Sequence, residues 1–372
     1  MKVGLVCPYN ILRGGGVQEC VLAIQAGLSK LGHQAKIITP TPPRNFTRTD
    51  NPLIIYVGGA TEVKSPFATS AEISVSANTE DLNKLINVEK FDILHFHEPW
   101  VPILSRQLLL RSSSVNIATF HAKLPETVLS RTIEKVVTPY TKSILKYFQG
   151  LTAVSDAAAE YVSNLTDQNI EIVPNGIDLT KYKSPKKRII GKKKSILFVG
   201  RLEKRKGVKY LLRAFIKLRE KRDDIELIIA GDGADRKKLE QFVADKKVSD
   251  VQFLGAVSEP KKLQLLRTCS LFCSPALYGE SFGIVLLEAM ATGAVTIAGD
   301  NPGYKSVMKD KGAISLVNPK KNDEFARRLA FLLDDLEMRK IWQQWAKTYI
   351  KQFSYDTIVS QYENIYQKLL QK

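Results

Sequence analysis

Two glutamates eight positions apart frame an apolar, helix-forming run near the three-quarter point of the chain. Glu280 precedes the run and Glu288 lies within it, in the sequence ESFGIVLLE. If a helix begins near Phe282, Glu280 lies in the loop beside the free backbone N–H groups that favour anions, and Glu288 projects about two turns further on. The segment then offers acceptors for hydroxyl groups together with donors for phosphates, which suits a sugar attached to a nucleoside diphosphate. An amphipathic helix with two solvated glutamates is the alternative.

A second segment carries cations directly after a predicted strand, in the run GRLEKRKG at 200–207. Arg201 provides a fixed planar cation and Lys206 a flexible ammonium, and together they could hold a diphosphate and neutralise the charge that grows as it leaves. We interpret Lys204 and Arg205 as solvated charges. The sequence has no Asp-x-Asp triplet, so we expect no required divalent ion, and no metal or other cofactor.

Three consecutive glycines, Gly14 to Gly16, follow the first predicted strand and precede its helix. Glycine lets the backbone approach a ligand closely, while the N-terminus of a helix favours negative charge. The spacing does not match the dinucleotide pattern GxGxxG, which argues against a nicotinamide cofactor. A flexible turn without a ligand is the alternative.

Short apolar runs of strand type alternate with segments of helical period along the whole chain. The strands predicted in the first half are 3–6, 35–38, 53–57, 93–96, 117–120, 151–154 and 170–173. Those predicted in the second half are 195–199, 225–230, 251–254, 271–273, 295–298 and 314–317. The alternation predicts an α/β protein with two Rossmann-like, doubly wound and largely parallel sheets.

The chain length predicts two domains, because 372 residues exceed the size at which one core usually stops growing. A charged stretch with proline and glycine, 183–194, is the expected linker. The domains would then be 1–183 and 184–354, with a final helix at about 355–372 crossing back to the first. Open α/β sheets bind ligands beyond the carboxyl ends of their strands, so two facing sheets predict an interdomain cleft.

The formal charge of +17 is concentrated in the second half of the chain. Residues 1–183 contain 18 Lys and Arg against 16 Asp and Glu, and the remainder contains 37 against 22. Such a basic half would attract phosphates, anionic lipid headgroups or nucleic acid. The lysines have no interleaved aromatic residues, so nucleic acid is not an expected partner. Solvated lysine-rich surfaces are the alternative.

Cysteine and histidine usage gives no sign of a metal site. The four cysteines lie in apolar stretches and are expected to be buried thiols in a reducing cytoplasm. His95 and His97 share a strand face, but no third ligand is evident, so zinc is not expected. The N-terminal apolar run is too short for a signal peptide, and no run approaches a membrane span. We expect a cytoplasmic protein that meets a membrane only at its surface.

Several of these segments together resemble one family of enzymes. The chain is similar to retaining glycosyltransferases of family 4, which have the GT-B fold. The similarity rests on the glycine-rich first turn, PNGID at 174–178, the 200–207 run, AGDG at 230–233 and the Glu280/Glu288 segment. Within the family it most resembles bacterial phosphatidylinositol mannosyltransferases, in the segments VCPY at 6–9, GGVQ at 15–18, HEP at 97–99 and ATFH at 118–121.

The resemblance implies roles for individual residues. The residues implied to be catalytic are His121, close to the sugar, Arg201 and Lys206, on the diphosphate, and Glu280, on the sugar hydroxyls. Further donor contacts are implied for Glu288 at the ribose, for the backbone of Phe282, Gly283 and Ile284, and for Gly15 and Gly16 near the phosphates. Tyr9 and Gln18 would face the acceptor.

The implied activity is retaining transfer of a hexose to a hydroxyl of a lipid-linked or soluble acceptor such as phosphatidylinositol. Mannose from GDP-mannose is the implied donor, and the location would be cytoplasmic or peripheral on the inner face of the cell membrane. The related enzymes use a basic amphipathic helix on the membrane, whereas 79–90 here has little cationic excess. Three alternatives stay open: a UDP-sugar-dependent family 4 transferase for glycans or glycolipids, a GT-B-like nucleotide-sugar epimerase, and a noncatalytic polyanion or membrane-surface binding protein.

Overall fold

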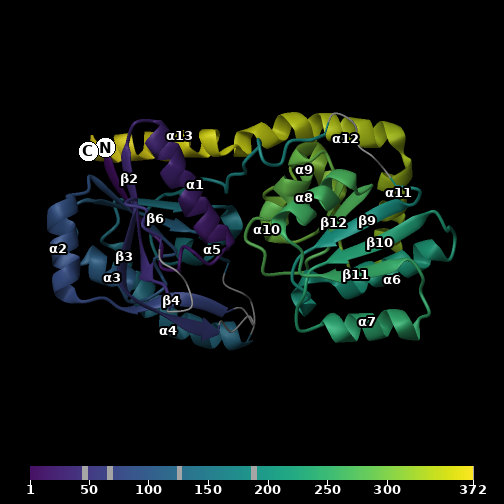
Figure 1. Ribbon diagram of the computed structural model, residues 1–372, viewed down its shortest axis with the longest axis horizontal. Helices are drawn as coiled ribbons and strands as arrows, with labels where there is room; N and C mark the ends of the chain where they lie inside the picture. The colour runs from purple at the N-terminus through teal and green to yellow at the C-terminus, as the bar shows by residue number, and fades with distance from the viewer. Residues whose placement is uncertain (44–48, 65–69, 124–127, 186–190, 372) are drawn as a thin grey trace. The chain divides into compact units, whose positions relative to one another are not determined.

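The protein consists of two compact units, each built on its own sheet (Figure 1). A computed structural model describes residues 1–43, 49–64, 70–123, 128–185 and 191–371. The first unit contains Met1–Gly176 and Tyr355–Lys372, and the second contains Ile177–Ser354. All but one of the strand pairs formed by the described residues are parallel, which confirms the predicted α/β class with two largely parallel sheets.

The second unit begins at Ile177, whereas the sequence analysis placed the domain boundary after residue 183. The two therefore differ in the assignment of 177–183. This stretch belongs to the second unit, where the buried Tyr182 donates a hydrogen bond from its hydroxyl to Oε1 of Glu288 at 2.7 Å. The backbone N–H of Ile177 also donates to the carbonyl of Phe353. Part of the predicted linker, 186–190, lies outside the described residues.

The first unit has an eight-stranded sheet in the order β4-β3-β2-β1-β5-β6-β7-β8. Its strands are β1 Lys2–Val6, β2 Gln34–Thr41, β3 Ile54–Lys64, β4 Ser70–Ser76, β5 Ile93–His97, β6 Val115–Phe120, β7 Gly150–Ala153 and β8 Ile170–Ile172. The sequence analysis missed β4, which pairs antiparallel with β3 and carries little of the apolar character that marks the central strands. The other strands are parallel, as predicted.

Six helices belong to the described part of the first unit. They are α1 Gly16–Lys30, α2 Thr79–Glu89, α3 Leu104–Leu109, α4 Val128–Leu145, α5 Asp156–Ser163 and α13 Tyr355–Leu370. Helix α1 ends just before Gly32, which has φ of +85° and whose N–H donates to the carbonyl of Ser29. Within the described residues, every helix of the protein is too short or too polar to cross a membrane.

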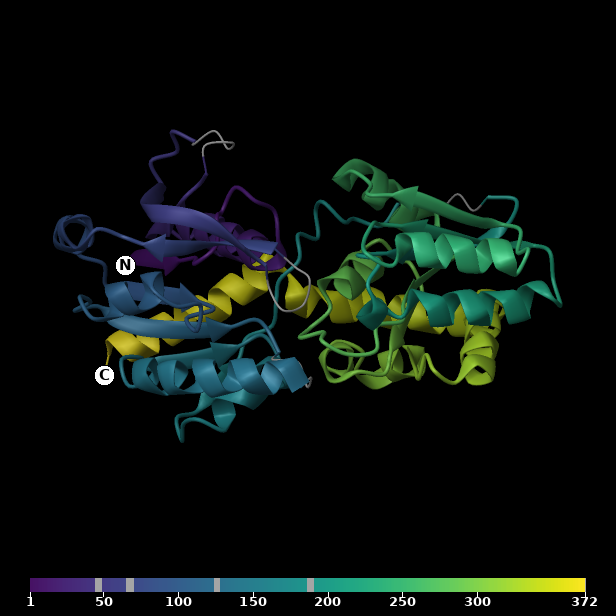
Figure 2. The same cartoon turned by 90° about the horizontal axis from the view of Figure 1, so that it is seen from below.

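Helix α13, the last in the chain, completes the core of the first unit. Its apolar and aromatic residues are buried in the same cluster as β1 and α1; they are Ile358, Val359, Tyr362, Ile365 and Tyr366. Figures 1 and 2 show α13, in yellow, running beside this sheet, and α1 packs along it. Gly27 makes this close approach possible, because a Cβ there would lie 2.5 Å from Cγ2 of Val359.

The second unit has a six-stranded, fully parallel sheet in the order β11-β10-β9-β12-β13-β14. Its strands are β9 Lys194–Val199, β10 Ile225–Ala230, β11 Val251–Gly255, β12 Leu271–Ser274, β13 Thr296–Gly299 and β14 Leu316–Val317. The strand predicted at 314–317 is shorter than expected, since Ile314 and Ser315 belong to a 3₁₀ helix.

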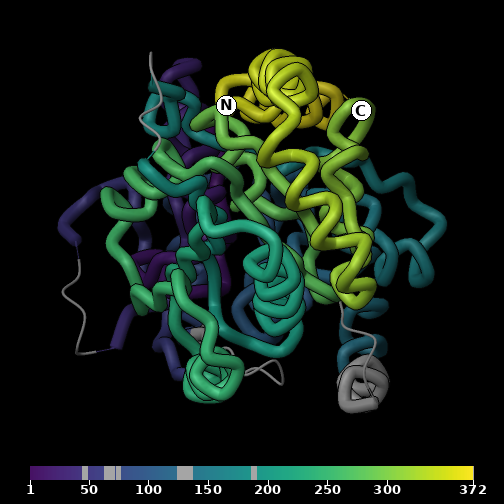
Figure 3. The backbone as a smooth tube through the Cα atoms, turned by 90° about the vertical axis from the view of Figure 1, so that its right-hand side faces the viewer, coloured from purple at the N-terminus to yellow at the C-terminus, as the bar shows by residue number. Residues whose placement is uncertain are grey.

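The backbone of the second unit can be followed from teal to yellow-green in Figure 3. Its α-helices are α6 Val208–Arg219, α7 Arg236–Asp245, α8 Glu259–Thr268, α9 Ile284–Ala291, α10 Pro302–Lys305, α11 Asn322–Asp334 and α12 Leu336–Tyr349. Short 3₁₀ helices occur at Lys204–Lys206, Asp310–Ser315 and Ile350–Phe353. Helices α6 and α11 pack together, as do α9 and α12.

Replacing Gly27 by Ala tests the packing of α13 on α1. Inside a helix this change normally stabilises by about 1 kcal/mol. Here the new methyl group meets the stiff, branched side chain of Val359, so we expect a net loss of about 1–3 kcal/mol in the free energy of unfolding. Urea titration measures it. Gly14→Ala, where a Cβ meets nothing within 4 Å, is the matched control. A Gly27→Ala protein at least as stable as the wild type would contradict the packing.

Candidate functional site

Each sheet has a point where the strand order reverses, and the glycine-rich turn, Arg201 and Glu280 follow strands beside these points. In the first unit β1 lies between β2 and β5, and in the second β9 lies between β10 and β12. The loop after β1 contains the glycine-rich turn, and Arg201 follows β9. Glu280 lies between β12 and α9. Open parallel sheets bind ligands beyond the strand ends at such reversals, so both positions are candidate binding sites.

In the second unit, a continuous chain of ion pairs joins the two predicted cations to Glu280. Arg201 Nη1 lies 3.0 Å from Oε1 of Glu203, whose Oε2 lies 2.9 Å from Nε of Arg205. Arg205 Nη1 contacts Oε1 of Glu280 at 2.7 Å, and the same oxygen is 2.8 Å from Nζ of Lys206. With three cations and two carboxylates, this chain of ion pairs has a net charge of +1.

The cations in this chain differ in how freely they can meet a ligand. The side chain of Arg201 is 48% exposed, whereas those of Arg205 and Lys206 are 17% and 15% exposed. The interpretation of Arg205 as a solvated charge is wrong, because it contacts two carboxylates and donates to the carbonyl of Gly279. Lys204 is exposed, as predicted. The charge pattern alone could not separate these two neighbours.

The backbone around Glu280 is fixed by close packing. A Cβ at Gly303 would lie 2.1 Å from the carbonyl oxygen of Glu280, so only glycine fits there. Tyr304 lies fully buried, and its hydroxyl is 2.7 Å from Oγ of Ser274 on β12. Burial, and then the nearby Glu280 carboxylate, raise the pKa of Tyr304 well above its usual value. Tyr304 is therefore a neutral phenol in this packing.

Helix α9 begins at Ile284, two residues later than the start near Phe282 that the sequence suggested. The reason is Gly283, which caps the helix in the left-handed region with φ of +111°. Phe282 is buried and its ring packs edge-on against Phe353, so its backbone alone remains for a ligand. The first N–H groups of α9 have no carbonyl of their own helix to bind.

Glu288 is buried on α9 and is bonded by two residues that the sequence analysis did not identify. Its Oε1 accepts hydrogen bonds from the Tyr182 hydroxyl at 2.7 Å and from Lys262 Nζ at 2.8 Å. Burial lowers the pKa of Lys262, but Glu288 and Glu259 outweigh it and raise that pKa above its usual value. Glu288 is thus an ordered, charge-compensated acceptor rather than a solvated glutamate.

In the first unit, a carboxylate from β4 anchors the glycine-rich loop. Glu72 is buried, and its Oε2 accepts from Nδ2 of Asn10 at 2.6 Å while its Oε1 lies 3.2 Å from Nη1 of Arg13. Gln18, which the resemblance assigns to the acceptor substrate, donates a hydrogen bond from its Nε2 to the carbonyl of Asn10 at 3.4 Å. A Cβ on Gly15 would lie 2.6 Å from Oε1 of Gln18. The missed strand therefore positions the turn.

A buried histidine cluster occupies the ends of β5 and β6. Nδ1 of His97 lies 2.9 Å from Nε2 of His121. The His95 ring bonds on both sides, with Nδ1 2.6 Å from the Tyr366 hydroxyl and Nε2 2.6 Å from Oγ1 of Thr119. Burial lowers the pKa of His95 to about 3 and of His121 to about 4, and it takes the pKa of His97 well below its usual value. All three imidazoles are therefore neutral near pH 7.

Glu98 follows β5 directly and binds the backbone beside His121. Its Oε1 accepts from the N–H of His121 and, at 2.7 Å, from the N–H of Ala122. Its φ is +50°, which is rare for a residue with a side chain. Burial raises the pKa of Glu98 to about 8, although the two backbone hydrogen bonds oppose the shift. The HEP sequence contained this residue but gave no sign of its strained backbone.

Tyr9 and Asn175, from two further loops, complete the surroundings of this cluster. Burial, and then the charge of Glu98, raise the pKa of Tyr9 well above its usual value. Asn175 is buried and partly offsets the effect of burial on the His121 pKa, but its Oδ1 has no hydrogen-bond partner among the described residues. The first unit thus surrounds His121 with polar groups that burial keeps uncharged.

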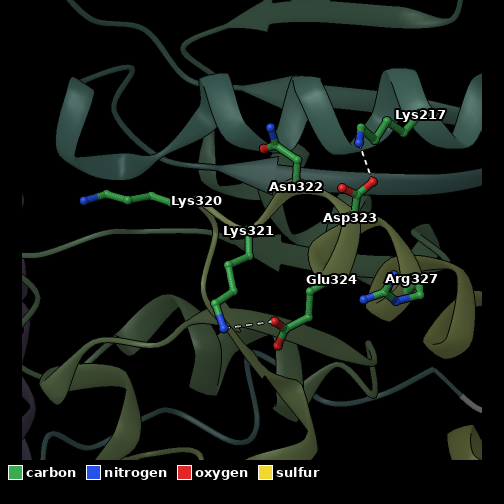
Figure 4. A pocket seen from close by; sticks show the side chains of 7 residues that line it. All are labelled: Lys217, Lys320, Lys321, Asn322, Asp323, Glu324 and Arg327. Carbon is green, nitrogen blue, oxygen red and sulfur yellow. Dashed lines mark hydrogen bonds and ion pairs between the residues drawn. The ribbon is translucent and has the colours of Figure 1, made fainter.

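A separate hollow of about 460 Å³ lies beside the start of α11 (Figure 4). It is lined by Lys217, Lys320, Lys321, Asn322, Asp323, Glu324 and Arg327. Lys217 pairs with Asp323, and Lys321 pairs with Glu324 at 3.5 Å. It contains none of the predicted site residues. In the described part of the chain, no three His, Cys, Asp or Glu side chains are grouped so as to hold a metal ion.

Comparison with known sequences relates both units to sugar transfer. Residues 14–181 match the model of Glycosyltransferase Family 4, and residues 180–349 match that of Glycosyl transferases group 1. The chain is 31% identical to the phosphatidyl-myo-inositol mannosyltransferase of Mycolicibacterium smegmatis, over 99% of this chain and 94% of the relative. The enzyme of the same name from Mycobacterium tuberculosis is 29% identical, over 99% and 97%.

Solved structures with little sequence identity share the fold. A glycosyltransferase from Rickettsia africae has a TM-score of 0.77 at 18% identity, covering 99% of this chain and 98% of its own. HepE from Anabaena, solved with UDP and glucose, has a TM-score of 0.74 at 17% identity, covering 99% of each chain. This likeness confirms the predicted GT-B fold.

The buried acid predicts an unusual dependence of stability on pH. The pKa of Glu98 is about 8 in the folded protein, against an ordinary value of 4.5. The unfolded chain therefore loses this proton at lower pH than the folded one. The stability from Glu98 is full below about pH 4.5 and is lost as the pH rises towards 8, by at most about 1.4 kcal/mol per pH unit.

Glu98→Gln removes this titration and keeps an oxygen for the two backbone N–H groups. We expect its melting temperature relative to the wild type to rise between pH 5 and pH 8, measured by calorimetry at matched ionic strength. Glu80→Gln, at an exposed position, is the control. Melting curves for Glu98→Gln and wild type that shift in parallel with pH would show that Glu98 is ionised in the folded protein.

Proposed function

Since the chain belongs to glycosyltransferase family 4, we propose that it transfers mannose from GDP-mannose, with retention of anomeric configuration, to a hydroxyl of an inositol lipid. The observation that carries the donor half of the proposal is the chain of ion pairs from Arg201 to Lys206 at the strand reversal of the second unit. The mannosyltransferases that share about 30% of its residues over nearly the full length support the choice of sugar and acceptor.

The diphosphate of the donor would bind to Arg201 and Lys206. Arg201 is the more exposed cation, and its planar guanidinium can hold two phosphate oxygens at once. Lys206 shares Glu280 with Arg205, so Glu280 keeps one cation when Lys206 turns to a phosphate. A diphosphate therefore gains an ammonium ligand without leaving a half-buried carboxylate unpaired.

Glu280, Glu288 and the start of α9 would hold the rest of the donor. Glu280 would accept hydrogen bonds from the hexose hydroxyls, and Glu288, held by Tyr182 and Lys262, would accept from the ribose. The backbone of Phe282, Gly283 and Ile284 would donate to the donor. Gly283 favours this role, because its left-handed conformation leaves no Cβ in the way.

The first unit would provide the acceptor side. Gly15 and Gly16 would lie close to the donor phosphates, while Tyr9 and Gln18 would contact the acceptor. His121 would contact the reacting sugar. Its imidazole is neutral near pH 7, so it offers hydrogen-bonding groups without a charge, which suits a hexose rather than a phosphate.

The chemical step would break the bond between the anomeric carbon and the diphosphate oxygen and form one to the acceptor oxygen on the same face of the sugar. The acceptor hydroxyl proton would pass to the departing diphosphate. Arg201 and Lys206 would stabilise the negative charge that develops on that leaving group. An inositol lipid acceptor would bring the protein to the inner face of the cell membrane from the cytoplasm.

Arg201→Ala and Lys206→Ala are each expected to lower kcat by about 100- to 1,000-fold, because each removes a cation from the leaving group. Thermal melting should change little, since Arg201 is largely exposed and Glu280 keeps Arg205 as its partner when Lys206 is removed. Lys204→Ala, an exposed lysine on the same 3₁₀ turn, is the matched control and should retain full activity. Folded Arg201→Ala and Lys206→Ala proteins that turn over like the wild type would refute the assigned roles.

The donor and acceptor are tested by product analysis. The protein is incubated with GDP-mannose or with UDP-sugars, alone and with phosphatidylinositol vesicles, and the lipids are analysed by mass spectrometry. We expect a hexosyl-inositol lipid from GDP-mannose. Hexose transfer from UDP-sugars but not from GDP-mannose would identify a UDP-dependent transferase. Isomerisation of the donor without an acceptor would identify an epimerase. Vesicle binding without any turnover would identify a noncatalytic protein. Each of these three results would contradict the proposal.

A further inference from the structure

Glu98 combines three features that a residue with only a packing role does not need. Its backbone has φ of +50°, its side chain is 99% buried, and its Oε2 has no hydrogen-bond partner within the described residues. An unpaired buried carboxyl oxygen and a left-handed backbone each cost stability. Such costs concentrate at functional sites, where the arrangement they permit is needed.

The strained backbone sets Glu98 directly against the end of β6. Its own N–H donates to the carbonyl of Thr119 at 2.9 Å, and its carbonyl accepts from the N–H of Val101 at 3.0 Å. Its side chain then turns to bind the N–H groups of His121 and Ala122 with a single oxygen. Glu98 therefore fixes the backbone on both sides of the junction between the end of β6 and His121.

His97 fixes the ring of the same histidine. Nδ1 of His97 and Nε2 of His121 are 2.9 Å apart, so one neutral ring donates to the other. Oδ1 of Asn175 has no hydrogen-bond partner among the described residues, so it does not fix the ring. The hydrogen bond with His97 holds the His121 ring in one orientation and in a single neutral tautomer, and leaves its Nδ1 for a ligand.

We propose that Glu98 is a positioning residue for the transfer reaction, which holds His121 at the reacting sugar through its hydrogen bonds to the backbone N–H groups of His121 and Ala122. The inference rests on the role proposed above for His121. A neutral acid suits this place, since no cationic side chain among the described residues forms an ion pair with Glu98. Ionised, it would place an unpaired negative charge in a buried position against the backbone of His121, where it also acts on the Tyr9 phenol.

The groups that face Glu98 from neighbouring elements do not titrate in the same range. Burial raises the pKa of Tyr9 well above its usual value and keeps His97 and His121 neutral down to acid pH. On α4, burial raises the pKa of Tyr140, which donates to the carbonyl of Pro99, to about 12. An alkaline loss of activity near pH 8 that depends on residue 98 is therefore specific to its carboxyl group.

Two variants separate positioning from folding. Glu98→Gln keeps an oxygen for the two backbone N–H groups and places an amide NH2 where the acid carries its proton. Glu98→Ala removes the oxygen and the proton-bearing group together. At pH 7 we expect Glu98→Gln to keep kcat within about threefold of the wild type. We expect Glu98→Ala to lose at least 30-fold in kcat with little change in the KM for the nucleotide sugar, because the donor diphosphate is held elsewhere. Glu80→Ala, in the exposed first turn of α2, is the control.

The pH profile of kcat is the readout that a purely structural role would not move. The wild type should lose activity as the pH rises through about 8, and Glu98→Gln should not. The inference is overturned if Glu98→Ala keeps its kcat, if its loss lies in stability alone, or if wild type and Glu98→Gln share the same alkaline limb.

A measurement independent of activity distinguishes this inference from the proposed function. In nitrogen-15 histidine spectra, with His121 assigned from a His121→Asn variant, the wild type should show a single neutral tautomer of the His121 ring and Glu98→Ala a mixture of tautomers. If no hexose is transferred from any donor but the spectra behave as expected, the proposed function fails and the positioning of His121 stands. If the His121 signal is the same in both proteins, the positioning role fails whatever the activity.

Discussion

The ion pairs that run from Arg201 to Lys206 impose the main constraint on the second unit. Five charged side chains from two loops must be held so that each contacts the next, and the parallel sheet does this by ending β9 and β12 side by side. Glu280 takes part in two of the pairs and lies directly before α9. Small residues at Gly207, Gly283 and Gly303 allow the necessary close approach of the backbone.

The first unit follows the opposite principle, because its cluster contains polar groups that burial keeps neutral. The rings of His95, His97 and His121 and the acid of Glu98 have no ion-pair partner among the described residues, and α13 adds the Tyr366 hydroxyl. Neutral groups recognise hydroxyls, whereas a set of cations recognises phosphate. In the proposed function, the neutral cluster of the first unit would contact hydroxyl groups, and the cations of the second unit would bind the diphosphate.

The sequence predicted what depends on local patterns and missed what depends on distant contacts. Apolar runs located the central strands, and the strand–glycine–helix order located Gly15. The antiparallel strand β4 was missed, since it is an edge strand of polar character, and with it the anchoring role of Glu72. Arg205 was misinterpreted, because its carboxylate partner Glu280 is 75 positions away. The left-handed backbone of Glu98 results from tertiary structure and has no signature in the sequence.

The central claim is that the cations of the ion-pair chain bind the diphosphate of the donor, and a crystal structure of the full chain with bound GDP tests it most directly. The account predicts that the β-phosphate lies within hydrogen-bond distance of the Arg201 guanidinium and of Nζ of Lys206, with Glu280 still paired to Arg205. A nucleotide bound elsewhere, with Lys206 still on Glu280, would contradict it.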